Sequence, residues 1–255
     1  MIFVTGDTHG AHDLDKISPL SWPEGQKLTR DDYLVICGDF GAIWSGGDRD
    51  QELLDFYERQ PWTTLWLDGN HENHDLIDEL PVSRCFGGRV HTIDEHPHVI
   101  HLMRGEVYDL PTSADKTVCA FVMGGAPSID RYLRTEGVSW WPRELPDYEE
   151  YDNAEANLAA CGWSVDYVFT HELPSDARAE VLSMGEPFAW GAYDEDPQIE
   201  TGELDEFLQD VDDRLNKDRL VMWYAGHHHM DRELDDQHCV LYQEVVELGG
   251  APLGF

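Results

Sequence analysis

Short apolar runs that end at a glycine or a polar residue recur along the chain. Several have the length and the β-branched or aromatic content of buried strands, and they span residues 2–5, 33–37, 63–67, 165–170 and 220–225. Segments with helical spacing of apolar residues lie between them, at residues 50–59, 73–80, 147–161 and 202–215. Strands that alternate with helices predict an α/β fold.

A different pattern occupies the middle of the chain. Two further apolar runs, residues 99–103 and 117–123, flank residues 105–110. We expect a meander of antiparallel strands here, and residues 240–246 could join it. Residues 185–200 are rich in glycine, proline and acidic side chains, which indicates a loop. No stretch has the composition of a long linker, so we expect a single domain over residues 1–255.

The charge of the chain narrows the classes of partner. The formal net charge is −35, from 52 acidic and 17 basic residues, while 41% of residues are hydrophobic. A globular protein with this surface repels nucleic acid phosphates and anionic lipid. The acidity is explained by a solvated or salt-adapted surface, by buried metal cations that offset part of it, or by both.

Cysteine usage and the N-terminal segment point to a cytoplasmic protein. The five cysteines form no CxxC pair, as is typical of reduced thiols. Residues 1–7 carry no basic region followed by a long apolar run, and no stretch approaches the roughly 18 apolar residues of a membrane span. We therefore expect neither a signal peptide nor a membrane partner.

Polar residues with metal-binding or proton-transfer chemistry follow the five predicted strands. They are Asp7, His9, Asp39, Asn70, His71, His171, His227 and His229. Ligands of α/β folds gather at the carboxyl ends of strands. Imidazole and carboxylate together suit Zn, Mn, Fe, Ni or Co, and a two-metal site needs a carboxylate that bridges the ions. Each motif alone occurs in ordinary turns and surfaces, but their joint order argues against coincidence.

The order Asp-x-His, Gly-Asp, Gly-Asn-His-Glu, His, Gly-His-x-His is similar to that of the calcineurin-like metallophosphoesterases. The resemblance extends from residue 7 to residue 229. It implies a four-layer α/β sandwich, in which two mixed sheets are flanked by helices. It also implies hydrolysis of phosphate mono- or diesters with two divalent ions, drawn from Mn, Fe, Zn, Ni and Mg, with Mn favoured.

The same resemblance implies a role for each residue. Asp7, His9 and His229 would bind the first metal, Asp39 would bridge both, and Asn70, His171 and His227 would bind the second. In an extended stretch, residues two apart point to the same side, so His227 and His229 can share a site while His228 faces away. His71 would lie close to the metals without binding either.

The expected mechanism uses a hydroxide that bridges the metals and attacks phosphorus. His71 would donate a proton to the leaving group or hold a non-bridging oxygen. A neighbouring carboxylate could orient His71 and raise its pKa. Glu72 is adjacent in the sequence, although a different acid could fill that role.

One branch of the family is disfavoured by the residues after Gly38-Asp39. Protein Ser/Thr phosphatases follow Gly-Asp with a close Asp-Arg pair that holds phosphate, whereas residues 40–44 here read FGAIW. Residues 124–134 resemble a segment of a bacterial and prophage subgroup of uncharacterised phosphoesterases. Arg131 or Arg134 could bind the substrate phosphate there, or both could be solvated side chains at a helix N-terminus.

Two other functions compete with phosphoester hydrolysis. A dimetal hydrolase could act on a non-phosphate bond such as an amide, and a non-catalytic metal-binding scaffold could share the fold. A scaffold would normally have lost ligands, and none is missing here. The charge and the lack of a Lys and Arg stripe favour a small phosphorylated substrate or nucleotide over duplex nucleic acid.

Overall fold

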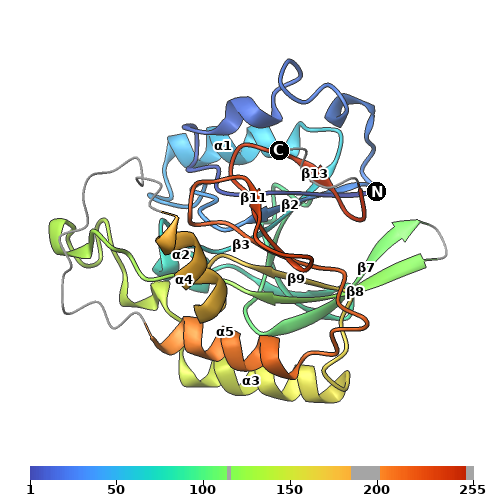
Figure 1. The fold of residues 1–255 in the computed structure, drawn as a ribbon. Helices are drawn as coiled ribbons and strands as arrows, with labels where there is room; N and C mark the ends of the chain where they lie inside the picture. Colours follow the sequence, from blue (N-terminus) through green and yellow to red (C-terminus); the bar gives the residue numbers. More distant parts are fainter. Residues whose placement is uncertain (114–115, 185–201, 251–255) are drawn as a thin grey trace.

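Two mixed sheets packed face to face form the centre of the computed structural model, which describes residues 1–113, 116–184 and 202–250 (Figure 1). The predicted loop at residues 185–200 lies outside these ranges. In the described part, the first sheet has the order β13 (Val246–Glu247), β1 (Ile2–Thr5), β2 (Tyr33–Cys37), β3 (Thr63–Leu67), β6 (Val99–Leu102), β5 (Gly88–Thr92) and β4 (Val82–Cys85). The second has the order β11 (Arg232–Glu233), β12 (His238–Val240), β10 (Met222–Ala225), β9 (Tyr167–Thr170), β8 (Lys116–Met123) and β7 (Glu106–Ser113).

Each sheet has a parallel centre. Strands β1, β2, β3 and β6 run parallel, and so do β8, β9, β10 and β12. Antiparallel neighbours complete the edges, for example β13 beside β1 and β7 beside β8. Parallel strands end at the same edge of a sheet, so the polar residues that follow them are brought together.

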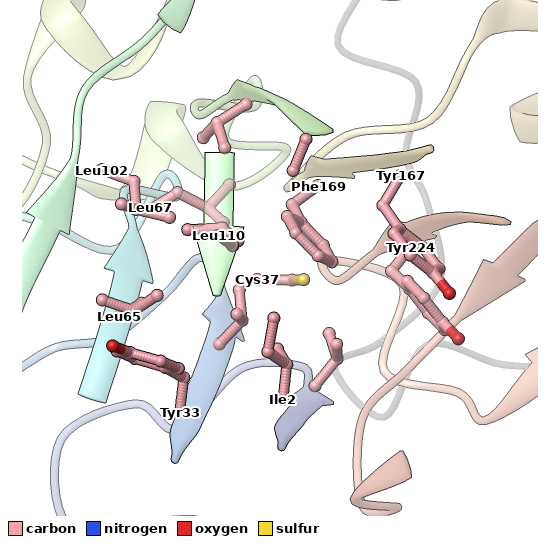
Figure 2. Close-up of a cluster of buried hydrophobic side chains, with 14 of the residues drawn as sticks. Ile2, Tyr33, Cys37, Leu65, Leu67, Leu102, Leu110, Tyr167, Phe169 and Tyr224 are labelled. Atoms are coloured by element: carbon pink, nitrogen blue, oxygen red, sulfur yellow. The ribbon is translucent and has the colours of Figure 1, made fainter. Parts of the chain in front are cut away.

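A hydrophobic core lies between the two sheets (Figure 2). Leu65 and Cys37 of the first sheet and Leu110 and Phe169 of the second are fully buried in it. The alternate residues of the same strands face outwards. In the central strands β2, β3 and β9 they are buried as well, because helices cover the outer faces. The continuous apolar runs of the sequence therefore reflect strands that are covered on both faces.

Helices form the two outer layers. Helix α1 (Asp48–Glu58) packs against the first sheet, and α3 (Tyr148–Ala160) and α5 (Glu203–Arg214) pack against the second, on the opposite side (Figure 1). Two shorter helices are α2 (His74–Asp78) and α4 (Ser175–Ser183). The expected four-layer α/β/β/α sandwich is confirmed. No helix in the described part of the chain is long and apolar enough to span a bilayer.

The predicted meander is wrong in two respects. Strands β7 and β8 form the expected hairpin, but β6 belongs to the other sheet, between β3 and β5. Residues 240–246 do not extend the hairpin either, because Val240 ends β12 and Val246 begins β13 in the first sheet. An apolar run gives no information about its partner strand, which long-range packing selects.

A candidate metal centre

The loops that follow five parallel strands converge at one edge of the sandwich. Strands β1, β2 and β3 come from the first sheet, and β9 and β10 come from the second. These loops carry all the predicted ligands and the predicted acid: Asp7, His9, Asp39, Asn70, His71, His171, His227 and His229. The site therefore lies where the two sheets meet, and neither sheet supplies it alone.

One group of potential ligands consists of Asp7, His9 and His229, whose donor atoms all lie within 4.8 Å of one another. The Nε2 atom of His229 is 3.0 Å from Oδ2 of Asp7, and the Nε2 atom of His9 is 3.8 Å from the same oxygen. Two imidazoles and a carboxylate with converging lone pairs can hold a divalent transition metal.

A second group consists of Asp7, Asp39 and His171, again within 4.8 Å, and all three are buried. Asp39 faces both groups, because Oδ1 lies 3.3 Å from Nε2 of His171 and Oδ2 lies 3.2 Å from Nε2 of His9. Asp7 also faces both, since its Oδ1 is 3.8 Å from Nδ1 of His171. Either carboxylate has the position that a bridge between two ions requires.

The remaining predicted residues surround the second group. The amide oxygen of Asn70 is 3.1 Å from Nε2 of His171, and the ring centroid of His227 is 4.9 Å from that of His171. The backbone N–H of His227 donates to Asp7 at 2.9 Å, and that of His71 donates to Asp39 at 2.7 Å. The backbone thus fixes both carboxylates while their other lone pairs stay directed into the site.

Backbone strain is concentrated at this edge. Among the described non-glycine residues with positive φ are His9 (43°), Asp39 (47°), His227 (66°) and His229 (50°). Such conformations persist only where the surroundings impose them, and they are common at functional sites. Gly226 shows why space is limited: a Cβ atom there would lie 2.4 Å from Oδ1 of Asp7. The Gly-His motif places backbone directly against a ligand.

The site attracts positive charge. Burial by itself lowers the pKa of His171, but Asp39 and Asp7 outweigh burial and raise the pKa to about 10. Burial likewise lowers the pKa of His9, and the same two carboxylates raise it to about 9. Protonated imidazoles thus balance the two acids. Oδ2 of Asp7 is buried and accepts no hydrogen bond of good geometry within the described residues. The donor set therefore fits metal cations, which would displace these protons.

His71 lies at the open side of the centre, beside Arg134. Its ring centroid is 5.4 Å from that of His9, and Nη2 of Arg134 is 2.8 Å from its Nε2. Burial lowers the pKa of His71, Asp39 raises it, and Arg134 lowers it again, with a lower pKa as the result. Arg131 begins the short 3₁₀ helix Arg131–Leu133, which Arg134 follows directly, and it is partly exposed.

Three polar residues support the site in ways that the motifs did not reveal. The carboxylate of Glu72, the candidate for orienting His71, instead accepts N–H groups of Phe40 and Gly41, the nearest at 2.6 Å, and so fixes the loop after β2. Ser128 accepts the amide N–H of Asn70 at 3.1 Å, which directs the amide oxygen towards His171. Glu172 lies 2.8 Å from Nε2 of His228. In the sequence, the only sign of a role for Glu72 and Glu172 is that each directly follows a motif histidine, and Ser128 has no such sign.

Comparisons with known proteins give partial matches. The chain is 33% identical to lariat debranching enzyme A of Xenopus laevis over 104 residues, which cover 35% of this chain and 18% of that protein. It is 32% identical to the lariat debranching enzyme of Danio rerio, again over 104 residues, with 35% of this chain and 17% of that protein covered. The chain thus matches less than a fifth of these curated relatives. No family model matches.

A search of solved structures finds a Staphylococcus aureus protein described as a 5'-nucleotidase, in complex with alpha-ketoglutarate. The alignment covers 94% of this chain and 48% of that chain, with 14% identity and a TM-score of 0.47. A similarity of this size carries no argument about fold or activity. The fold and the candidate centre of this chain rest on its own geometry.

Proposed function

We propose that this chain is a dimetal phosphoesterase that hydrolyses phosphate mono- or diesters of small phosphorylated molecules or nucleotides. The observation that carries the proposal is the pair of overlapping ligand groups that share Asp7, built on converging strand ends. The similarity to lariat debranching enzymes supports a nucleotide-containing ester as the substrate class. The assignment to a bacterial or prophage subgroup and the cytoplasmic location stay predictions.

The proposed roles extend the two ligand groups by Asn70 and His227, which lie beside His171. Asp7, His9 and His229 would hold one cation, and Asn70, His171 and His227 would hold the other. Asp39 is proposed as the bridge, because its two oxygens face His9 and His171 separately. The mixture of carboxylate, imidazole and amide donors without thiolate suits Mn²⁺, Fe²⁺, Zn²⁺, Ni²⁺ or Mg²⁺, of which we favour Mn²⁺.

When bound, the two cations supply positive charge for the phosphoryl oxygens and acidify a water molecule. The protein itself positions the substrate and supplies a proton. His71 is held by its backbone at Asp39, so its ring lies at the rim of the centre, where a leaving group would sit. An anionic phosphoryl group beside His71 would raise the pKa of the ring, which would then carry the proton for the leaving oxygen.

Arg134 is proposed to bind a non-bridging phosphate oxygen. Asp130 holds its Nε at 2.7 Å and Ser139 accepts from its Nη1 at 3.2 Å, so the guanidinium is aimed at His71. A planar guanidinium recognises phosphate well, and a phosphate oxygen would take the place of the His71 ring at Nη2 of Arg134. Arg131, on the same turn, is the second candidate for this contact.

Metal dependence is the first test of the proposed function. Hydrolysis of p-nitrophenyl phosphate and bis-p-nitrophenyl phosphate should disappear after chelation and return when Mn²⁺ is added. An amide substrate assayed in parallel separates phosphoester hydrolysis from hydrolysis of another bond. Full activity in a chelated sample that elemental analysis shows to be metal-free would contradict the two-metal proposal.

The second test separates the acid from the ligands. His71→Gln should keep both metals and lower kcat by about 10²–10⁴-fold, as expected for loss of general acid catalysis. The loss should be smallest for nitrophenolate, which leaves without a proton. His12→Gln, at an exposed position, is the matched control and should leave kcat unchanged. A His71→Gln protein without metal would show that His71 is a ligand.

A further inference from the structure

Two residues outside the motifs contact the outer side of the first ligand group. Asp13 lies at the start of the 3₁₀ helix Leu14–Ile17, and Tyr242 follows strand β12 at the other end of the chain. Neither belongs to the ligand set. Their contacts with His9 and His229 raise the question of what they contribute to metal binding.

Asp13 fixes the orientation of His9. Nδ1 of His9 lies 2.7 Å from Oδ2 of Asp13, while Nε2 faces the centre, 3.2 Å from Oδ2 of Asp39. The two ring nitrogens therefore have separate tasks. A histidine that donates one N–H to a carboxylate presents the lone pair of its other nitrogen to a metal, and the carboxylate raises the basicity of the ring.

Tyr242 contacts His229 directly and is linked to His9 through Asp13. Its hydroxyl donates to Oδ1 of Asp13 at 3.0 Å. Its ring stacks on that of His229, with centroids 4.6 Å apart and planes 12° from parallel. Both oxygens of Asp13 are thus occupied, and the His229 ring rests on an aromatic face.

The backbone of Tyr242 is held rigidly. Its carbonyl accepts from the buried ammonium of Lys16, which is 6% exposed and also donates to the carbonyl of Asp7 at 2.6 Å. Its N–H donates to Asp231 at 2.8 Å. Lys16 therefore ties the end of strand β1 to the segment that carries Tyr242, so the stacked ring has a defined position relative to Asp7.

We propose that Asp13 and Tyr242 are positioning residues for the first cation: they fix His9 and His229 so that the affinity of this site depends on the Tyr242 hydroxyl. The inference rests on the proposed metal centre and goes beyond it, because it assigns metal affinity to two residues that bind neither metal nor substrate. A purely structural role would instead change the stability of the fold and leave the affinity of the folded protein for metal unchanged.

The experiment is a Co²⁺ titration of the full chain after metal removal, followed by calorimetry and by the visible absorption of bound Co²⁺. Asp13→Asn should weaken one of two binding events by about 10–100-fold, the usual effect of losing such a partner. Tyr242→Phe keeps the stacked ring and loses only one hydrogen bond, so about 2–10-fold is expected. The double variant should show less than the product of the two effects, because both act through His9.

Matched controls make the same chemical changes elsewhere. Asp15→Asn removes a carboxylate two residues away that contacts Ser21 at 3.3 Å, and Tyr148→Phe removes a hydroxyl from a side chain that is 78% exposed. Both should bind Co²⁺ like the wild type. Thermal unfolding of the metal-free proteins shows which variants fold; if Asp13→Asn does not, Tyr242→Phe decides the question.

The outcomes separate this inference from the proposed function. If folded Tyr242→Phe binds both ions with wild-type affinity and spectrum, or if the wild type binds no Co²⁺, the positioning role is refuted. If the variants lose affinity as expected but the wild type hydrolyses no phosphate ester with any metal, the inference stands and the proposed activity falls.

Discussion

Two buried clusters of charged residues flank the end of strand β3, and they balance their charge differently. In the candidate metal centre, the carboxylates of Asp7 and Asp39 have imidazoles as their charged partners. In the neighbouring cluster, the carboxylate of Asp68 receives Nε of Arg104 at 2.8 Å and Nε2 of His101 at 3.1 Å. A guanidinium keeps its charge at all ordinary pH values, whereas an imidazole can lose its proton.

This difference agrees with the proposal that the first cluster binds metal and the second is a structural ion network. Arg104 closes the Asp68 cluster, and its second ion pair, with Glu150 at 3.2 Å, extends the network to helix α3. Both carboxylate oxygens of Asp68 accept hydrogen bonds, one from Arg104 and one from His101. In the proposed centre, by contrast, metal ions would take the place of the protons on His9 and His171. The proposed distinction is therefore the permanent charge of Arg104, which has no counterpart in the ion pairs that Asp7 and Asp39 form within the described part of the chain.

The largest expected effect contrasts the two aspartates directly. Asp39→Asn should lose at least one of the two metals, and with it hydrolysis, because an amide cannot bridge two cations as a carboxylate does. Asp68→Asn should keep both metals. Elemental analysis of the purified proteins measures the difference. Equal metal loss in both variants would remove the distinction between the clusters.

The next effect concerns the stability of the second cluster. Arg104→Met leaves the carboxylate of Asp68 buried without its main partner, which should lower the free energy of unfolding by about 3–5 kcal/mol. Arg59→Met, which breaks an exposed pair with Asp55, is the control and should cost less than about 1 kcal/mol. Urea unfolding measures both. A loss for Arg104→Met as small as the control would show that Asp68 is not a buried charge.

The smallest expected effect is a pH dependence of the stability of the metal-free protein, which metal binding should reduce. The pKa values of His9 and His171 are raised from 6.5 to about 9 and about 10, so the folded metal-free protein keeps protons that the unfolded chain releases. Their contribution to stability is fully present below pH 6.5 and is lost as pH rises through 9 and 10. Burial lowers the pKa of Lys16 to about 8. Its contribution to stability opposes this trend only above that pH.

The measurement is thermal unfolding of chelated and Mn²⁺-loaded protein between pH 6.5 and 8. The chelated protein should lose stability across this range, and the loaded protein should lose less, because metal has replaced the protons. Groups outside the centre, such as His238, contribute to both samples, so the difference isolates the centre. If stability falls equally with pH in the chelated and the loaded protein, metal does not bind through these histidines.

Strand and helix prediction succeeded where burial made the local pattern unambiguous. Strands β1, β2 and β3 begin and end at the predicted residues, because each is buried along its whole length and contains no charged residue. Helix α4 was missed, since Val181 is its only buried side chain and no apolar face repeats along it. Strands β4 and β5 were missed as well, and β4 is largely exposed, with a polar composition that resembles a loop.

Local sequence sufficed to locate five buried strands and to show that residue types able to bind metal or transfer a proton follow each of them. An apolar run and the polar residue that follows it can both be recognised within a few consecutive residues. The pairing of β6 and β13 in the first sheet, the contact of Arg134 with His71, and the Asp13–Tyr242 support behind His9 required the folded structure. These features join residues far apart in the sequence, such as Phe3 with Glu247 and Asp13 with Tyr242, and long-range packing alone determines such contacts.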